Sequence, residues 1–541
     1  MTRKITRATR LLLLALALAL AAGWTLGVAE PAQGGTYSLP LSEEKVTLVF
    51  MNADTNTAGA SYGDGKALAI NAAEEATNVH IEWELYPNAD YADVMNLRLA
   101  SQADLPDIMR LKGDQGGVYL AKAYSSGAII GLNDLIDKYG ANYKAVMEAN
   151  PEYKNAIVMP DGQVVAFHKT QNDSYSYAVQ LIRKDWLDNL GLEMPKTLDE
   201  FVDVAVAFKT QDPDGNGVND TYGMHCANPE GSMFEYNQLG SYFGLHLCTG
   251  SGWAMRDGKV TYEWVTPEAK DFVKWFRKLY EADVLPPDYM SVTYPDHDAR
   301  VASGQVGLIP RSWPSNIIEW SQPTSAMKQN QPDAEWVLVP MMETEYSKMI
   351  VKEPTFRRSN GVAITSACKN PDLAYKWLDW TTYDPVGSRL NNMGIEGLMY
   401  EMVDGKPVKL DSPYNARTPV EDGSWWGLEY VEQYYTDDVA ESGFKIGGLS
   451  RDLPIIQSIL ANKQYLEEPF YPPIPSLEDS ATITNLLADI DTYRSEMWVK
   501  FMDGTIDIDA EWDNYVGTLT DGMQLSKVLE LYQAAYDAMN P

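Results

Sequence analysis

The sequence predicts an α/β protein, and two observations carry that prediction. Short apolar or alternating segments typical of strands are separated by longer segments in which apolar residues recur at helical spacing. Strands that alternate with helices indicate βαβ units and a mostly parallel sheet. The chain has 541 residues, which is enough for large cores, and a prior of about 150 residues per domain suggests three or four units.

The first αβ series lies in the N-terminal third of the chain. Residues 45–50 predict a buried strand, residues 79–85 a strand with alternating polarity, and residues 106–109 a short strand. The intervening helices are expected at 65–77, which is rich in alanine, and at 91–101, where the apolar residues have helical spacing.

The same alternation continues toward the C-terminus after residues 164–167. Further strands are expected at 178–183, 306–310, 336–340 and 361–365. Further helices are expected at 197–210, 267–282, 371–382, 479–503 and 525–539. No repeat and no low-complexity linker interrupts the series, which predicts lobes joined by short crossovers.

The N-terminus has the three parts of a secretory signal peptide. Basic residues among the first ten precede the apolar run 11–23, and small residues follow at 27–29. The run is too short for a membrane span of about 20 residues, and a buried N-terminal helix would not explain the basic flank. We therefore expect residues 1–29 to be a signal peptide and the mature protein to be extracytoplasmic.

The cysteines bear on anchoring and on redox state. Residues 21–24 resemble a lipoprotein cleavage box, but Trp24 stands where the lipid-bearing cysteine should be, and the first cysteine is Cys226. We expect no N-terminal lipid, so the protein would be secreted or held at the cell surface by a partner. Cys226 and Cys248 could pair in an oxidising compartment, leaving Cys368 free, but buried free thiols are favoured.

The charge balance and the missing motifs exclude several functions. Acidic residues outnumber basic ones 76 to 43, which disfavours nucleic-acid binding and adhesion to anionic lipid, because both need basic surfaces. The sequence has no phosphate-binding loop, no nucleophile elbow and no zinc-protease helix, and its five histidines lack ligand spacing. We therefore expect a protein that is not an enzyme and has no catalytic residues.

Several segments resemble, in order along the chain, motifs of extracellular solute-binding proteins, the substrate receptors of ABC importers. The main segment is 183–192 (RKDWLDNLGL), followed by 195–201 (PKTLDEF), where Gly191 can end one helix and Thr197 can cap the next. Further matches are residues 104–108, 302–307, 369–374, 394–397, 400–407 and 501–504. The chain is most similar to the large oligosaccharide-binding, lipoprotein-like subgroup of Gram-positive bacteria.

This resemblance implies the type II periplasmic-binding-protein fold, in which two α/β lobes joined by hinge crossovers close over a ligand in the cleft. It predicts one lobe from residues 42–170 plus 336–395. The other lobe would comprise residues 171–335 plus 396–541 and include a helical C-terminal extension. The implied partners are an oligosaccharide and the transmembrane subunits of an ABC permease, with the receptor itself a monomer.

Residues 212–220 (DPDGNGVND) match the first nine positions of an EF-hand loop, which places oxygen donors at alternating positions on a tight turn. The candidate ligands are Asp212, Asp214, Asn216, the Val218 carbonyl and Asp220. Gly223 occupies the twelfth position, where a bidentate Glu is usual. A polar turn without metal is the alternative. The register of the donors favours structural Ca²⁺, and relatives in the family carry calcium at a similar loop.

The aromatic residues suit a carbohydrate ligand. The chain has 32 Tyr and 15 Trp, whose rings combine an apolar face with a polar group, although buried Trp would give the same count. Trp313 follows the strand 306–310, where similar sugar receptors place a stacking Trp; a packed loop aromatic is the alternative. Trp425 and Trp426 follow a turn signal. Because adjacent residues cannot both face the core of one regular element, at least one of them is expected to be available for the ligand.

Other candidate ligand-binding residues are polar. Asp54 follows the first strand and could accept hydrogen bonds from hydroxyl groups or cap the next segment. The weaker candidates, each of which an ion pair or a scaffold role would also explain, are Arg183, Arg311, Tyr177 and Glu396.

The leading hypothesis is therefore a receptor that captures an extracellular oligosaccharide and delivers it to an ABC permease. The alternative is a secreted carbohydrate-active enzyme resembling a glycoside hydrolase, since an acid pair can arise by chance among so many carboxylates. A binding protein for a peptide or a lipid headgroup is a third possibility.

Overall fold

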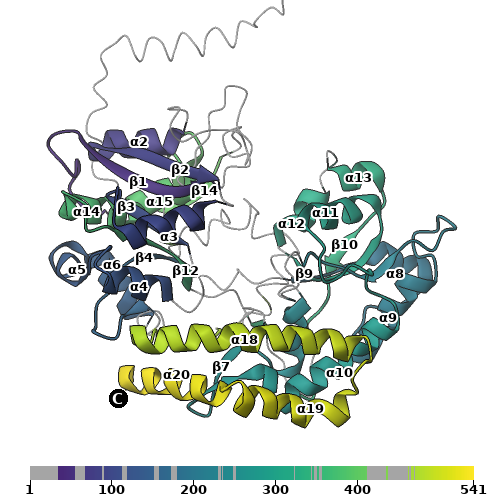
Figure 1. Ribbon diagram of the computed structural model, residues 1–541. Helices are drawn as coiled ribbons and strands as arrows, with labels where there is room; N and C mark the ends of the chain where they lie inside the picture. The colour runs from purple at the N-terminus through teal and green to yellow at the C-terminus, as the bar shows by residue number, and fades with distance from the viewer. Residues whose placement is uncertain are drawn as a thin grey trace, which may run out of the picture.

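The computed structural model has two bodies, each built around its own sheet, and long C-terminal helices run along one side of both (Figure 1). The residues that it describes are 35–54, 67–87, 90–112, 118–150, 157–171, 179–228, 233, 236–247, 252–312, 314–321, 323, 325–342, 344–346, 350–351, 356–410, 434–435, 461, 465–467 and 469–540.

The first body contains a six-stranded sheet in the order β15-β4-β12-β3-β1-β2. Strand β1 (Val46–Asp54) lies between β2 (Val79–Pro87) and β3 (Ile108–Lys112) and is parallel to both. Strand β12 (Phe356–Ile364) is inserted antiparallel between β3 and β4 (Phe167–Gln171). The short edge strand is β15 (Tyr434–Tyr435), which is parallel to β4.

Helices cover both faces of this sheet, which explains why its interior strand β1 is almost continuously apolar. Successive side chains of β1 enter different cores: Phe50 packs in one cluster with Trp377, and Met51 in the other with Met109. The helices of this body are α2 (Leu68–Thr77), α3 (Tyr91–Ser101), α4 (Val118–Ser125), α5 (Asn133–Tyr139), α6 (Ala141–Ala149), α14 (Pro371–Thr382) and α15 (Pro385–Met393).

The second body contains a four-stranded sheet in the order β10-β5-β9-β6. Strand β5 (Val179–Arg183) is antiparallel to β9 (Val306–Ser312) and β10 (Trp336–Leu338), and β6 (Tyr222–Met224) is parallel to β9. The surrounding elements are α8 (Lys184–Leu190), α9 (Leu198–Thr210), η2 (Tyr236–Phe243), β7 (Trp253–Arg256), β8 (Lys259–Tyr262), η4 (Glu263–Val265), α10 (Pro267–Glu281), α11 (Tyr294–Ser303), α12 (Pro314–Ser321) and α13 (Ala326–Asn330).

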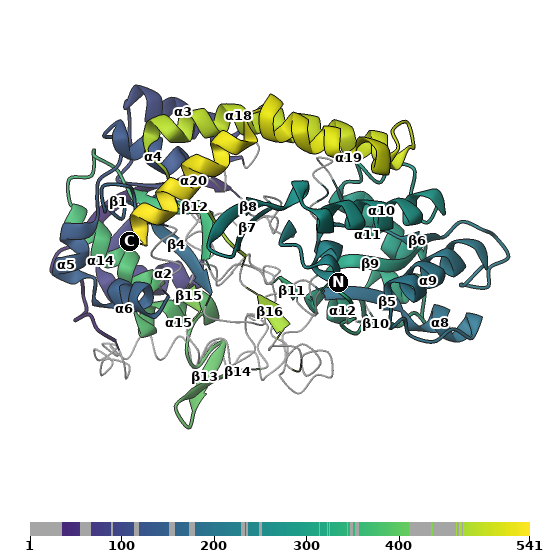
Figure 2. The ribbon, with the colours of Figure 1, turned by 90° about the horizontal axis from the view of Figure 1, so that it is seen from below.

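The C-terminal helices join the two bodies along one side, as both views show (Figures 1 and 2). Helix α18 (Leu477–Met502) contacts α4 of the first body and α10 of the second. Its last turns bury Met497, Trp498 and Phe501 in the large core of the second body. The remaining elements are α19 (Ile508–Gly517), the π-helical turn η8 (Thr518–Gly522) and α20 (Leu525–Met539).

Three short pairs of strands complete the described part of the chain. Strands β13 (Tyr400–Val403) and β14 (Lys406–Lys409) form a hairpin that packs against the end of α15 through Met393 and Tyr400. Strands β7 and β8 form another hairpin. Strand β11 (Ile350–Val351) is parallel to β16 (Leu466–Glu467).

The structure corrects one expectation about the sheets. They are mixed rather than mostly parallel, because β10 and β12 run antiparallel to the strands that they join. None of the helices in the described ranges is both long and apolar enough to span a membrane.

Candidate functional site

In the first body, several strand ends lie along one side of the sheet, and one of them carries the predicted ligand-binding residue Asp54. The parallel strands β1 and β3 end at Asp54 and Lys112, and β12, which is antiparallel to β3, begins on the same side. In open α/β sheets, ligands bind outside the carboxyl ends of the strands. Asp54 is exposed at this edge, as a ligand-binding role requires.

The second body has an equivalent edge. Val179, the first residue of β5, pairs with Ser312, the last residue of β9. Ser312 Oγ accepts a 2.9 Å hydrogen bond from Asn316 Nδ2, which fixes the turn into α12. Tyr177 precedes Val179 by two residues and Trp313 directly follows Ser312, but both lie outside the described residues. Trp425 and Trp426 also lie outside them.

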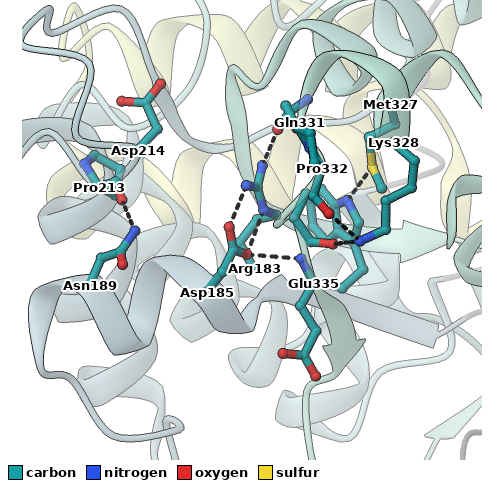
Figure 3. Close-up of polar contacts among 12 residues, drawn as sticks. Arg183, Asp185, Asn189, Pro213, Asp214, Met327, Lys328, Gln331, Pro332 and Glu335 are labelled. Carbon is teal, nitrogen blue, oxygen red and sulfur yellow. Dashed lines mark hydrogen bonds and ion pairs between the residues drawn. The ribbon is translucent and has the colours of Figure 1, made fainter. Parts of the chain in front are cut away.

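The two predicted arginines are both buried, and Arg183 is a structural residue. Its Nε and Nη2 donate to the two carboxylate oxygens of Asp185 at 2.8 and 2.6 Å, and its Nη1 donates to Gln331 Oε1 at 2.7 Å (Figure 3). Only 3% of Arg183 is exposed. Arg311, with 7% exposed, lies in the fully buried strand β9. The guanidinium of Arg183 therefore has its donors occupied by the scaffold.

The segment 183–192 owes its composition to this packing. Asp185 Oδ1 also accepts from the Glu335 backbone N–H at 3.1 Å, and the Lys184 N–H donates to the Glu335 carbonyl at 2.8 Å, so the start of α8 is fastened to β10. Arg183 lies over the Trp186 ring, 4.7 Å from its centroid. Gly191 ends α8 at φ 67°, as predicted.

The predicted helix start at Thr197 is confirmed. The Glu200 N–H donates to Thr197 Oγ1 at 3.2 Å, and Glu200 Oε2 accepts from the Lys196 N–H at 2.7 Å. These reciprocal contacts satisfy donors that the first turn of α9 leaves open.

Glu396 lies apart from both sheet edges. It is exposed in the turn before the β13–β14 hairpin, where its backbone forms an isolated bridge to Tyr400. The described residues thus bring Asp54 to one sheet edge and the ends of β5 and β9 to another, and they leave Glu396 and Arg183 elsewhere.

The acidic loop at 212–220 folds as a tight turn whose side chains bond to one another. The Asn216 N–H lies 3.1 Å from Asp212 Oδ1, and the Gly217 N–H donates to Asp212 Oδ2 at 3.0 Å. Asn216 Nδ2 donates to Asp214 Oδ2 at 2.7 Å and lies 3.4 Å from Asp220 Oδ1. Burial and the neighbouring carboxylates Asp212 and Asp220 raise the pKa of Asp214. Val218 is exposed at the tip of the loop.

The donor set fits a hard cation, because three carboxylates and an amide gather on one turn. Their mutual repulsion, seen in the raised pKa of Asp214, is the kind that a cation relieves. Yet among the described residues, no group of three or more His, Cys, Asp or Glu side chains is arranged to hold a metal ion. In this structure the Asn216 amide, rather than a ligand arrangement, organises the carboxylates.

Gly223, the twelfth position of the loop pattern, is fixed by packing and not by metal binding. It lies in β6, where a Cβ atom would come within 2.1 Å of the Ala205 carbonyl oxygen. No side chain can occupy this position without moving α9, so a bidentate Glu is sterically excluded here.

The five histidines are scattered in sequence, but two of them are in contact in the structure. His225 Nδ1 lies 2.9 Å from His297 Nδ1, and Arg300 Nη1 lies 2.9 Å from His225 Nε2. Because a guanidinium only donates, His225 Nε2 accepts and its Nδ1 carries the proton given to His297. Burial lowers the pKa of His225 to about 3 and that of His297 to about 4. Because His225 and His297 are far apart in sequence, their spacing did not indicate this contact.

A cavity of about 360 Å³ lies beside Trp336, at the end of β5 opposite Val179. Two polar side chains of its lining bond to other lining residues: the Trp336 indole N–H contacts Met327 Sδ at 3.0 Å, and Lys328 Nζ donates to the Pro332 and Ala334 carbonyls (Figure 3). Because Trp336 pairs with Arg183, this cavity lies at the other end of β5 from the strand ends that we associate with ligand.

Neither Cys226 nor Cys368 forms a disulfide in the described part of the chain, which agrees with the favoured alternative. Cys248 lies outside the described residues. Burial raises the pKa of the Cys368 thiol to about 12, which makes it a poor nucleophile.

Two α/β bodies linked by several chain crossings are the architecture of a two-lobed binding protein. Residues 59–384 match the family model of the bacterial extracellular solute-binding protein, and the chain belongs to this family. The recognition made from the ordered motifs is thereby confirmed.

The relatives agree over nearly the whole chain. The fructooligosaccharide ABC transporter substrate-binding protein FusA of Streptococcus pneumoniae is 28% identical, over 93% of this chain and 92% of FusA. A solved structure of FusA in complex with kestose is similar, with a TM-score of 0.67 and 26% identity, over 91% of this chain and 99% of that one. A FusA EF-hand mutant in complex with fructo-nystose superposes equally well.

The fold is also shared with a more distant protein, the alginate-binding protein AlgQ2 solved without calcium ion. Its TM-score is 0.71 at 22% identity, over 92% of this chain and 99% of AlgQ2. The predicted type II periplasmic-binding-protein fold is confirmed by these neighbours. FusA and AlgQ2 are both described as binding proteins.

Proposed function

We propose that the protein is the substrate-binding receptor of an ABC importer and that it captures an oligosaccharide. The observation that carries this proposal is the end-to-end similarity to FusA, whose name assigns it fructooligosaccharides. The polygalacturonan/rhamnogalacturonan-binding protein YtcQ of Bacillus subtilis, 31% identical over 45% of this chain, supports the wider class of oligosaccharide ligands.

The proposed site lies between the two sheet edges, with Trp313 as its first stacking residue. Support comes from the pairing of Val179 with Ser312, which brings the segments preceding β5 and following β9 to one place. Asp54 supplies an exposed carboxylate on the opposite lobe. Trp425, Trp426, Tyr177 and Arg311 remain proposed ligand-binding residues. For Arg183 we favour the scaffold alternative, because its guanidinium forms a buried ion pair with Asp185.

The proposed mechanism is hinge closure. Each lobe would contribute part of the site. A ligand that contacts both lobes therefore stabilises the closed state, by as much as its affinity for the closed state exceeds its affinity for the open state. We assign no catalytic step, because a receptor needs only binding and release. Export of the mature chain and its monomeric state form part of this proposal. The expected lobe boundaries are moved, because β10 belongs to the sheet of the second body and β15 to that of the first.

We also propose a structural Ca²⁺ at the loop 212–220, held by Asp212, Asp214, Asn216, the Val218 carbonyl and Asp220. The oxygen donors gathered on one turn and the raised pKa of Asp214 support it, as do the neighbours AlgQ2, solved without calcium ion, and the FusA EF-hand mutant. The ion would replace the repulsion between the carboxylates by attraction and stiffen the turn that leads into β6.

Mature protein incubated with a panel of fructans, galacturonides and other oligosaccharides tests the function. We expect a ligand-dependent rise in melting temperature for at least one oligosaccharide, with no product detected by chromatography. Turnover of the sugar would instead support the glycoside-hydrolase alternative.

The Trp313→Ala variant tests the site. We expect affinity to fall by about tenfold or more, the usual effect of removing an aromatic anchor. The matched control is Trp320→Ala, which removes a tryptophan from the same lobe near the distant cavity, where its ring lies 5.6 Å from that of Trp336. Unchanged affinity in Trp313→Ala would remove this residue from the site.

A further inference from the structure

Two of the chain connections between the lobes meet in one small ribbon, β11 paired with β16. Strand β11 lies in the connection that leads from β10 of the second lobe to β12 of the first. Strand β16 lies in the connection that leads from β15 of the first lobe to α18. The register pairs Ile350 with Leu466 and Val351 with Glu467. Whatever holds this ribbon therefore constrains two connections at once.

The ribbon is held against the second lobe by an ion pair. Glu467 Oε2 lies 3.2 Å from His246 Nε2, and strand β11 contacts η2, which ends shortly before His246. Glu467 is about half exposed, whereas the His246 side chain is 16% exposed. The contact thus joins a solvent-accessible carboxylate on the ribbon to a mostly buried imidazole on the lobe.

The imidazole is positioned by a buried charge cluster. Glu263 Oε1 lies 3.5 Å from His246 Nδ1, and the other oxygen of Glu263 accepts from the His246 backbone N–H. Arg256 Nε donates to Glu263 Oε1 at 3.0 Å, and Arg256 Nη2 donates to the Gly244 carbonyl at 2.8 Å. The charged groups facing His246 in the described structure are thus Glu263 of η4, Glu467 of β16 and, through Glu263, Arg256 of β7.

Further contacts fasten the preceding part of the same connection. Thr344 Oγ1 donates to the Tyr242 carbonyl, and the Tyr346 ring lies 5.2 Å from the Phe243 ring. Tyr346 Oη also donates to Asp271 of α10 at 3.0 Å. The path from β10 to β11 thus follows the surface of the second lobe.

The other connection changes lobes just after the ribbon. Phe470 packs against the large core of the second body and lies 6.1 Å from the Tyr536 ring, measured between centroids. Ile474 is buried in a core of the first body. The chain therefore passes between lobes within a few residues of Glu467, so anchoring Glu467 restricts the bending of this crossing.

The anchor depends on the proton of His246. Burial alone would lower the pKa of His246, but the hydrogen bonds and charges of Glu263 and Glu467 outweigh burial and raise it above its ordinary value. The sign follows directly: the charged imidazole is present at low pH, and its attraction for Glu467 is lost as the pH rises through the raised pKa.

We propose that the His246–Glu467 pair is a proton-dependent latch that holds the β11–β16 ribbon on the second lobe and thereby controls the hinge. With the latch closed, the β11–β16 ribbon is already ordered. With the latch open, the ribbon must be ordered again when the lobes close, so ligand binding is weaker. This regulation of oligosaccharide capture rests on the proposed function.

Hydrogen exchange of the ligand-free protein tests the latch without any sugar. Protection factors of the amides in β11 and β16 are measured at pH 6 and pH 9 and corrected for intrinsic exchange. We expect protection to fall about two- to fivefold at pH 9, the range of a partly exposed ion pair. The Glu467→Gln variant should show the lower protection at both pH values. Glu478→Gln, an exposed acid on α18, is the charge-matched control.

Two outcomes of the exchange experiment overturn the latch: equal protection of the wild-type ribbon at both pH values, or a Glu467→Gln variant that keeps the wild-type response. The second outcome would assign the pH dependence to Glu263 alone. Because Glu467 is half exposed, its substitution leaves the core intact, and an unchanged melting temperature verifies this.

Affinity for kestose, or for the best oligosaccharide of the panel, is then measured at both pH values. We expect it to be about two- to fivefold weaker at pH 9 in the wild type and independent of pH in Glu467→Gln. Equal wild-type affinities would show that the ribbon does not control capture. If no oligosaccharide binds, the proposed function fails, while the exchange result still decides the latch.

Discussion

At the scale of single residues, Arg183 shows how a buried cation holds a surface motif in place. Its side chain is 4% exposed and that of Asp185 is 19% exposed, so their bidentate contact is largely removed from water. Breaking such a pair by deleting one partner leaves an uncompensated charge. Asp185 also accepts from the Glu335 N–H, so the loss would loosen the junction between α8 and β10.

We therefore expect Arg183→Ala to lower the free energy of unfolding by about 3 kcal/mol, and Arg183→Lys to recover only part of this, because Lys cannot form the bidentate contact. Denaturant unfolding at fixed pH measures it. Lys184→Ala is the control, since its pair with Asp188 is exposed to solvent and contributes little to stability. A loss of sugar affinity in Arg183→Lys without a loss of stability would contradict the structural role.

The same residue marks the limit of residue-level prediction from sequence. The spacing of residues 183–192 correctly indicated a strand end, a short helix and a Gly cap. It gave no sign that Gln331 would accept a hydrogen bond from the guanidinium, or that the Glu335 N–H would bond to Asp185, about 150 positions away. Arg183 was consequently grouped with ligand-binding residues, although these partners lie between α13 and β10 of the same lobe.

At the scale of elements, prediction succeeded where a pattern is local and failed where pairing decides. The continuous apolar run in β1 indicated a strand buried on both faces, and the two cores around Phe50 and Met51 confirm it. The three-residue strand β6 was not predicted, because it exists only through its pairing with β9. The direction of β12 was likewise invisible, since periodicity carries no information about a partner strand.

The loop 212–220 is the element for which a metal changes the expected behaviour. After chelation, titration with Ca²⁺ should release heat and raise the melting temperature, because an ion that binds only the folded state stabilises it. Asp214→Asn should abolish both effects, since it removes the carboxylate whose pKa the neighbouring acids raise. Glu75→Gln, an acid on the other lobe, should abolish neither. Absence of a calorimetric response in the wild type would leave the loop as a polar turn.

At the scale of the whole molecule, the two bodies contain buried groups with opposite responses to acid. In the second body, burial keeps the stacked pair His225–His297 neutral, with pKa values of about 3 and about 4. In the first, burial raises the pKa of Asp379 to about 7, although Tyr37 Oη and Asn142 Nδ2 donate to its Oδ2 at 2.8 and 2.9 Å.

The linkage has a different sign in each body. Below about pH 6.5, the ordinary pKa of His, His225 and His297 bind protons in the unfolded chain but not in the folded protein. The free energy of unfolding of the second body therefore decreases as the pH falls. Between about pH 7 and pH 4, the folded Asp379 holds a proton that the unfolded chain has released, so unfolding becomes harder as the pH falls. Each such proton contributes about 1.4 kcal/mol per pH unit.

We therefore expect the second body to unfold before the first when the pH is lowered from 6.5 to 4.5. Hydrogen exchange should show falling protection in α9 and β9, while α14 and β1 keep or gain protection. His297→Gln should roughly halve the acid sensitivity of the second body, because it removes one of two displaced protons. Asp379→Asn should abolish the gain in the first body and leave the second unaffected. Equal loss of protection in both bodies would contradict the prediction and would mean that α18, which packs against both, couples them into one unfolding unit.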